Sequence, residues 1–216
     1  MGGSTSQRLE AVVLAAGRSS RMGRPKPLLP LPEGGAVIER VVAQMAPHVG
    51  RVVVVVGHLG GQVAALAQRA GASIAINRDV DRGMLSSVQE GIAAVGDEAS
   101  GALLCLGDQP ELDGRTIGPV VAAAAGADLV IPTHDGHGGH PVYVARRFFA
   151  EILALPPDTA GGLRTVVRGH PEATIEIELP RPELLVDMDT PLDYQRTWRR
   201  LAAQQKETEG THTHDR

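Results

Sequence analysis

Four continuous apolar runs predict buried strands at residues 11–15, 52–56, 102–106 and 129–131. Because these runs do not alternate with polar residues, we expect both faces of each strand to be covered, as in a parallel sheet. Apolar residues at helical spacing, bounded by Gly, Pro or Asp, predict helices at residues 36–46, 61–70, 84–95 and 116–125. Strands that alternate with helices predict an α/β fold with a mostly parallel sheet and helices on both faces.

Beyond Pro132 the pattern changes to shorter units, which we interpret as an extension of the same sheet. In order, it predicts a strand at 141–144, helices near 147–155 and 162–167, and a strand at 173–178. A final helix is expected to begin at Pro191, with Thr190 suited to cap it. The chain is polar from Gln204 onward, so we expect a folded domain over residues 8–203 and a disordered tail over 204–216.

Composition narrows the class of protein. A chain of 216 residues fits one domain. Its net charge is −4 and its basic residues are scattered, so neither nucleic acid nor an anionic membrane is an expected partner. The single cysteine, Cys105, lies within the apolar run ALLCL, which is typical of a core residue in a reducing compartment. The first residues lack the apolar centre of a signal peptide, and we expect a cytoplasmic protein with no membrane span.

The first strand is followed by a loop that could bind phosphate, LAAGRSSRMGRPKPLLP. It is not a P-loop, because Lys26 lies between two prolines and no helix follows directly. It also lacks the glycine spacing of the dinucleotide-binding fold. Gly17 and Gly23 allow backbone N–H groups to face an anion, while Arg18, Arg21 and Lys26 supply positive charge. The loop therefore predicts an anion site, with a solvent-exposed basic loop as the alternative.

Two further unusual segments also follow predicted strands, GDQP at residues 107–110 and HDGHGGHPV at residues 134–142. Ligands of open α/β sheets bind beyond the carboxyl ends of the strands, so we expect one shared site there. Spacings of three between His134, His137 and His140 in a glycine-rich loop do not define a tetrahedron, which argues against zinc.

The pattern L-A-A-G-x-S-x-R-M-G-x-x-K-x-L-L-P resembles the signature of nucleotidylyltransferases, and specifically that of molybdenum-cofactor cytidylyltransferases. Further similarity lies in NRDVDRGMLSSVQEGI, LLCLGDQP, GHGGHPVY, GGLR and VDMDTPLDY, so it extends over nearly the whole chain. The resemblance implies a single Rossmann-like, three-layer domain of the GT-A-like kind. It also implies transfer of CMP from CTP to molybdopterin with release of pyrophosphate. A molybdenum hydroxylase apoenzyme is a further partner that it suggests.

The resemblance implies roles for individual residues. Arg21, Lys26 and Asp108 would be catalytic, and Asp108 and Asp189 would hold Mg²⁺, with Asp187 as the alternative to Asp189. A turn or helix cap is the other interpretation of both aspartates. The nucleotide would be bound by Leu14, Ala15, Ala16, Gly17, Arg18, Lys26, Asn77, Gly83, Ser86 and Ser87. Helix capping is the alternative for Asn77 and the two serines.

The acceptor side would be formed by Gly139, His140, Pro141 and Arg164. Ala16 stands where guanylyl-transferring relatives have glycine, and its methyl group favours the smaller base of CTP over that of GTP. Two other functions stay open at this point. One is transfer to another phosphorylated small molecule, such as a sugar phosphate or a phospholactate-like acid. The other is a non-catalytic molybdopterin carrier, against which the triphosphate-binding residues argue.

Overall fold

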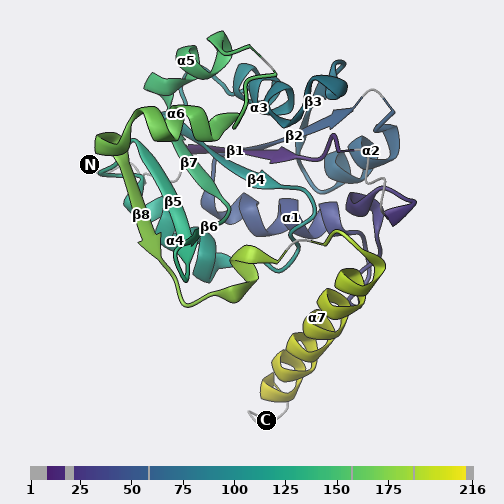
Figure 1. The fold of residues 1–216 in the computed structure, drawn as a ribbon. Helices are drawn as coiled ribbons and strands as arrows, with labels where there is room; N and C mark the ends of the chain where they lie inside the picture. Colours follow the sequence, from purple (N-terminus) through teal and green to yellow (C-terminus); the bar gives the residue numbers. More distant parts are fainter. Residues whose placement is uncertain (1–8, 18–21, 58, 157, 187, 213–216) are drawn as a thin grey trace.

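A computed structural model describes residues 9–17, 22–57, 59–156, 158–186 and 188–212 of the chain (Figure 1). Within these residues the strands form one eight-stranded sheet, in the order β3-β2-β1-β4-β7-β5-β6, with β8 paired to β5. The strands are β1 (Leu9–Leu14), β2 (Arg51–Gly57), β3 (Ser73–Asn77), β4 (Gly101–Leu106), β5 (Leu129–His134), β6 (His137–Gly138), β7 (Val142–Ala145) and β8 (Thr174–Glu178).

The centre of the sheet is parallel, as the apolar runs predict. β3, β2, β1 and β4 all pair in parallel, and Val12 of β1 lies opposite Val53 and Leu104 of its two neighbours. These side chains are fully buried, because helices cover both faces. β7 then pairs antiparallel with β4 and with β5, while β5 and β8 are parallel. The mostly parallel α/β fold is therefore confirmed, and β4 lies at the junction between its two parts.

Helices cover both faces of the sheet in a three-layer arrangement (Figure 1). On one face α3 packs across β1, β2 and β3 and contacts α5, which in turn contacts α6. On the other face lie α1, its neighbour α2, and α4. The bounds are α1 (Val37–Met45), α2 (Gly61–Arg69), α3 (Met84–Ala93), α4 (Gly114–Ala123), α5 (Phe149–Ala154) and α6 (Leu163–Gly169). Each of these helices falls on a segment that the apolar spacing predicts.

Two strands were not predicted from the sequence. β3 is short, forms one edge of the sheet and has an apolar run of only three residues, 74–76, of which Ile76 is exposed. β6 has only two residues and forms a hairpin with β5 through the turn at Asp135 and Gly136. Neither segment carries enough apolar residues to stand out from a loop.

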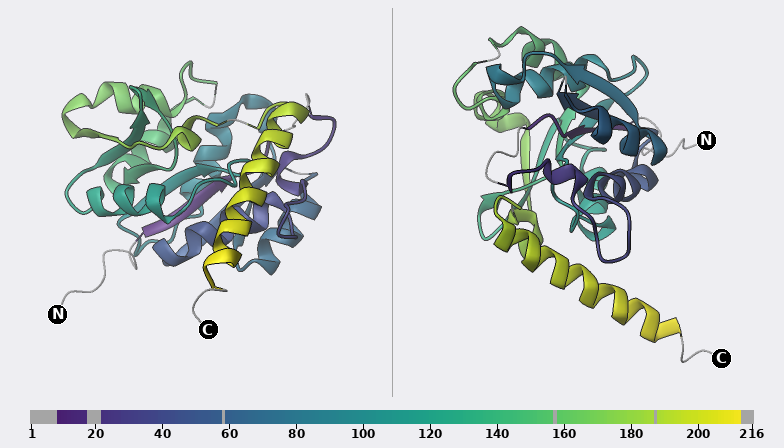
Figure 2. Two further views of the ribbon diagram at one scale, coloured as in Figure 1. Left: turned by 90° about the horizontal axis from the view of Figure 1, so that it is seen from below. Right: turned by 90° about the vertical axis from the view of Figure 1, so that its right-hand side faces the viewer.

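The last helix, α7 (Pro191–His212), leaves the body of the domain as an arm (Figures 1 and 2). Its first half is held by the buried residues Thr197 and Leu201. The helix crosses the boundary expected at Gln204 and continues to His212, in agreement with the high helix propensity of Gln, Lys and Glu. The division into a domain over 8–203 and a tail over 204–216 stays a prediction. None of the helices in the described part of the chain has the length and apolar character needed to cross a membrane.

Candidate active site

A cavity of about 420 Å³ opens at the carboxyl ends of β1 and β4, where the sequence places its unusual loops. It is lined by Leu14, Ala15, Ala16, Gly17, Lys26, Pro27, Val80, Gly83, Met84, Ser87, Leu106, Gly107, Asp108 and Asp189. The lining residues come from four separate segments of the chain, which the sheet brings to one edge. Of the three segments expected to share a site at this edge, the opening loop and GDQP line the cavity, whereas HDGHGGHPV does not; the segment before α3 forms a further wall.

Glycine residues shape two walls of this cavity. At Gly107 a β-carbon would lie 2.9 Å from Cβ of Ala15 and 3.0 Å from the carbonyl oxygen of Leu14, so only glycine lets the end of β4 lie against the end of β1. The backbone N–H of Gly107 donates to the carbonyl oxygen of Leu14 at 2.9 Å, so the backbone hydrogen bonds between β4 and β1 continue into the site. Gly83, at the start of α3, has a φ of 94°, a left-handed conformation that favours glycine.

Lys26 joins two carboxylates in one wall of the cavity. Its Nζ donates to Oδ2 of Asp108 at 2.8 Å and to Oδ1 of Asp189 at 2.6 Å. The side chain of Lys26 is only 13% exposed, whereas those of Asp108 and Asp189 are 23% and 44% exposed. Burial of the ammonium lowers the pKa of Lys26, but its hydrogen bonds to the two aspartates outweigh this, and the pKa lies above its usual value. Lys26 is therefore a fixed positive charge at neutral pH.

The position of Lys26 follows from its local sequence. It begins the short 3₁₀ helix η3 (Lys26–Leu28), with Pro25 before it and Pro27 inside the turn. Proline fixes φ, so the turn holds the lysine backbone at low entropic cost. No long helix follows, and α1 begins only at Val37, as the sequence indicates.

Asp189 is held by the start of α7. The next residue, Thr190, caps this helix: its backbone N–H donates to Oδ2 of Asp193 at 2.9 Å, and its hydroxyl oxygen accepts from Asp193 N at 3.3 Å. The predicted cap at Thr190 is confirmed. The cap fixes the direction in which the chain enters the helix, and Asp189 is thereby placed beside Lys26.

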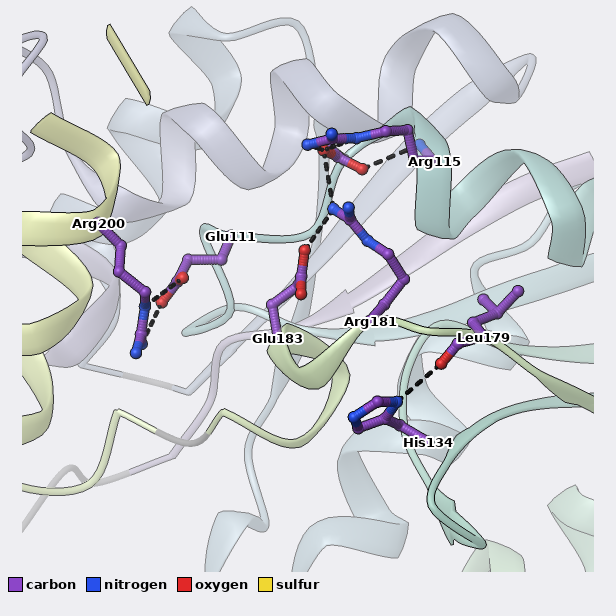
Figure 3. A network of polar contacts seen from close by, with 8 residues as sticks. Glu111, Arg115, His134, Leu179, Arg181, Glu183 and Arg200 are labelled. Atoms are coloured by element: carbon purple, nitrogen blue, oxygen red, sulfur yellow. Dashed lines mark hydrogen bonds and ion pairs between the residues drawn. The ribbon is translucent and has the colours of Figure 1, made fainter. Parts of the chain in front are cut away.

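Further contacts tie α7 to the rest of the site (Figure 3). Glu111, three residues after Asp108, is buried and accepts hydrogen bonds from Nε and Nη2 of Arg200, both at 2.7 Å, and from the hydroxyl of Thr197 at 2.8 Å. The hydroxyl of Tyr194 donates to the carbonyl oxygen of Pro30 at 2.9 Å, close to the segment that carries Lys26. The two aspartates thus lie on segments that are attached to each other.

A second ionic network holds the chain that leads to Asp189 (Figure 3). Arg181 donates to Oδ2 of Asp113 at 3.1 Å and also contacts Glu183, in the short helix η8 (Pro182–Leu185). Asp113 itself caps α4 by accepting from the backbone of Arg115. Burial raises the pKa of the Asp113 carboxyl, but hydrogen bonds from Arg115 and the nearby charge of Arg181 outweigh this effect. The pKa of Asp113 therefore lies below its usual value. The network keeps the loop after β4 and the segment before α7 together.

The polar residues Asn77, Ser86 and Ser87 form a buried group beside the cavity. Asn77 is 1% exposed, and its Nδ2 donates to Oγ of Ser86 at 2.8 Å and to Oγ of Ser87 at 2.9 Å. Ser86 in turn donates to the carbonyl oxygen of Gly83 at 2.7 Å. Of these, Ser87 and Gly83 line the cavity, whereas Asn77 and Ser86 lie behind it.

The residues expected on the acceptor side lie outside this cavity. At Gly139 a β-carbon would lie 2.8 Å from the carbonyl oxygen of Leu184, so the glycine is required where β6 packs on η8. Nδ1 of His140 lies 3.2 Å from the carbonyl oxygen of Leu104 in β4, and the peptide bond between His140 and Pro141 is cis. Arg164 is exposed on α6. Their role in acceptor binding stays a prediction.

The three histidines of HDGHGGHPV do not converge on one point. In the described part of the chain, one group of three or more His, Cys, Asp or Glu side chains has its ligand atoms close together, and it consists of His134, Asp135 and Glu178. Nδ1 of His134 is already 2.8 Å from the carbonyl oxygen of Leu179 (Figure 3). The cavity contains none of these side chains.

Three residues named in the sequence analysis, Arg18, Arg21 and Asp187, lie outside the described residues. Arg18 and Arg21 stay predicted phosphate ligands, and Asp187 stays the alternative to Asp189.

Comparison with known proteins gives the family. The MobA-like NTP transferase domain matches residues 11–174, which include β2, β3, β4, most of β1 and most of the cavity lining. The chain belongs to this family. It is thus a MobA-like nucleotidyltransferase, and the resemblance seen in the sequence is confirmed at this level.

Several relatives of this MobA-like nucleotidyltransferase are similar over most of their length. The molybdenum cofactor cytidylyltransferase of Escherichia coli is 28% identical over 187 residues, which cover 86% of this chain and 93% of the relative. A probable molybdenum cofactor guanylyltransferase of Mycobacterium avium is 30% identical over 194 residues, 87% of this chain and 94% of the relative. The structure of Rv0371c from Mycobacterium tuberculosis in complex with manganese superposes with a TM-score of 0.70 at 27% identity, covering 88% of this chain and 97% of the other.

The cluster around Lys26 can accept a divalent cation. Asp108 and Asp189 offer oxygen ligands only, they are partly exposed, and both line the cavity beside the ammonium of Lys26. Mg²⁺ and similar hard ions prefer such carboxylates together with phosphate oxygens and water. The donor set of this MobA-like nucleotidyltransferase therefore fits a hard divalent metal.

Some residues of the site were not identified from the sequence. Val80, Met84 and Gly107 line the cavity. The glycine that precedes Asp108 in GDQP was the available signal for Gly107, since glycine at a strand end often marks close backbone approach. Glu111 and Arg200 left no signal, because their pairing joins residues 89 positions apart.

Proposed function

We propose that this nucleotidyltransferase transfers CMP from CTP to molybdopterin that carries molybdenum, with Mg²⁺ and with release of pyrophosphate. The observation that carries the proposal is the ammonium of Lys26 between two carboxylates in the wall of a cavity of about 420 Å³. Such a cavity offers room for a base and ribose beside a charged phosphate site. The similarity to the E. coli cytidylyltransferase supports the choice of acceptor.

In the proposed reaction, an oxygen of the acceptor's terminal phosphate attacks the α-phosphorus of CTP. The bond from this phosphorus to the bridging oxygen of the β-phosphate breaks, and pyrophosphate leaves with that oxygen. No protein nucleophile is required, so the protein contributes position and charge. Lys26 neutralises negative charge that develops on the leaving group, together with Arg21 as a predicted partner. Mg²⁺, bound by Asp108 and Asp189, would polarise the phosphate oxygens.

The nucleotide is assigned to the cavity lining. The segment from Leu14 to Gly17 would supply backbone N–H groups, and Gly83 and Ser87 the opposite wall. The methyl group of Ala16, which lies among the lining residues, occupies space beside the base and favours cytosine over guanine. Asn77 and Ser86 are buried behind the cavity and do not face the nucleotide directly. They contribute to nucleotide binding by holding Ser87 and the segment at Gly83 in place.

The acceptor is assigned to the side of the loop at Gly139, His140 and Pro141, with Arg164 as a further predicted contact. We propose a cytoplasmic location, in agreement with a buried, unpaired Cys105. A molybdenum hydroxylase apoenzyme would receive the product.

The test is release of pyrophosphate by the purified protein with CTP, GTP, ATP and UTP, each with molybdopterin carrying molybdenum, a sugar phosphate and phospholactate. Product mass identifies the nucleotide transferred. We expect turnover with CTP and the molybdenum-loaded pterin. A preference for GTP would contradict the cytidylyl assignment, and turnover only with another phosphorylated acceptor would contradict the assigned substrate. Tight pterin binding without pyrophosphate release would indicate a carrier.

A further inference from the structure

The buried amide of Asn77 has an orientation that its neighbours determine. Its Oδ1 accepts from the backbone N–H of Asp79 at 2.8 Å. A backbone N–H can only donate, so the oxygen of the amide must lie on that side and the NH₂ group on the other. The NH₂ group therefore faces the two serine hydroxyls, and both of its hydrogens are used, one for Ser86 and one for Ser87.

Both serine hydroxyls accept a hydrogen bond from Asn77, but they differ in whether their own hydroxyl hydrogen already has an acceptor. Ser86 uses its one hydroxyl hydrogen on the carbonyl oxygen of Gly83, at 2.7 Å. For Ser87 no second partner of the hydroxyl is found among the described residues, and Ser87 lines the cavity. A hydroxyl has one hydrogen, and Ser87 has already accepted from an N–H donor. Its hydrogen is therefore available to a group in the cavity.

We propose that Asn77 is a positioning residue that fixes the Ser87 hydroxyl as a hydrogen-bond donor toward the nucleobase. This inference rests on the proposed function, because it assigns the base to the wall of the cavity formed by Ser87. The Watson–Crick edge of cytosine presents two acceptors, O2 and N3, and one donor, the N4 amino group. A fixed donor selects an acceptor at that point, and a base that presents an N–H there leaves two donors facing each other, which is unfavourable in a buried site.

Asn77→Asp tests the direction of this hydrogen bond with almost no change of shape. At mildly alkaline pH a carboxylate can only accept, so the Ser87 hydroxyl turns its hydrogen toward residue 77 and presents lone pairs to the cavity. We expect the Kd for CTP to rise ~10- to 100-fold, with kcat at saturating CTP changed much less. A Kd within about 3-fold of wild type would overturn the proposal.

A double-mutant cycle with Ser87→Ala shows whether Asn77→Asp weakens CTP binding through the Ser87 hydroxyl or through a general change of structure. In the Ser87→Ala background, Asn77→Asp should change the Kd for CTP by less than about 3-fold, since the donor is already absent. An undiminished effect would show that Asn77 acts by another route. Ser86→Ala is the matched comparison, because it removes the other partner of the same amide. A larger rise in Kd for Ser86→Ala than for Ser87→Ala would overturn the assignment.

Nucleotide analogues test the same contact in protein variants that fold normally. In 3-deaza-CTP the N3 acceptor is replaced by C–H, and in 2-thio-CTP the O2 acceptor is replaced by a weaker one. We expect one of the two to bind wild type less tightly than CTP and to lose that difference in Ser87→Ala. Equal binding of CTP and both analogues by wild type would refute this inference alone, whereas absence of any nucleotide binding would refute the proposed function.

Discussion

Gly91 lies where α3 crosses the sheet, and replacing it with alanine should weaken the fold. A β-carbon at this position would overlap Cγ1 of Val12 and lie 3.0 Å from Cγ2 of Val55. Both valines are fully buried in the parallel centre of the sheet. Because a β-branched side chain has little rotamer freedom, neither valine can turn away at low cost.

The size of the effect follows from two opposing contributions. Packed carbons lie ~3.5–4.0 Å apart, so α3 must move away from the sheet by on the order of 1 Å. Overpacking of a core costs ~1–3 kcal/mol, and this overlap belongs at the upper end, whereas alanine gains about 1 kcal/mol over glycine inside a helix. The net destabilisation is about 2 kcal/mol, which corresponds to a decrease in Tm of ~4–8 °C for a domain of this size.

Chemical denaturation and thermal unfolding of Gly91→Ala measure this loss. Gly61→Ala, in the first turn of α2, is the matched control, because a β-carbon there meets no atom within 4 Å. Val12→Ala removes the overlapping methyl group, so Gly91→Ala should cost at least ~1 kcal/mol less in that background. A Tm for Gly91→Ala equal to or above that of wild type would refute the reasoning. The first turn of α3 lines the cavity, and we therefore also expect a higher KM for the nucleotide.

Four further changes test the site and the core. Lys26→Ala should reduce turnover on the order of 10²-fold, because in the proposed reaction the ammonium stabilises charge that develops on the leaving group, whereas Lys206→Ala in α7 should not; near-normal kcat in folded Lys26→Ala would contradict the assignment. Asp108→Asn should reduce metal-dependent pyrophosphate release far more than it lowers the Tm, and activity independent of divalent metal would show the metal site to be wrong. Ala16→Gly should shift the ratio of kcat/KM for CTP and GTP toward GTP by up to ~10–200-fold, and an unchanged ratio would place the discrimination elsewhere. Burial raises the pKa of Cys105 to about 12 from its usual 9.0, so the unfolded thiol ionises first and the free energy of unfolding should fall as pH rises from 9.0 toward 12; denaturation curves of Cys105→Ala should show a smaller decline, and an equal decline would contradict this source.

The parallel centre of the fold could be predicted from the sequence because its strands are buried on both faces and therefore appear as continuous apolar runs. Runs such as that of β2 (Arg51–Gly57), with five consecutive valines, have no other common explanation in an α/β pattern. The order of the strands in the sheet could not be predicted from the sequence. β7 lies between β4 and β5 and runs antiparallel to both, and this depends on contacts between distant segments and not on local pattern.

The site was predicted where it depends on strand ends and not where it depends on side-chain orientation. Lys26 and Asp108 follow strands whose carboxyl ends must meet at one edge, and the structure brings their side chains into contact. Asn77 and Ser86 belong to the same segment as Ser87, but the sequence could not show that they are buried behind it. That distinction needs the direction of each side chain, which periodicity alone leaves open for residues around a turn.

The placement of Asp189 at the start of α7 has a consequence for how the protein is made. Asp189 lies 163 residues after Lys26, and the helix that holds it docks through Thr197 and Arg200 on Glu111. Domains begin to fold while the chain is still being synthesised, from the N-terminus onward. A nascent chain that has assembled the parallel centre of the sheet still lacks the second carboxylate. The contact of Lys26 with both carboxylates can thus form only after α7 has left the ribosome.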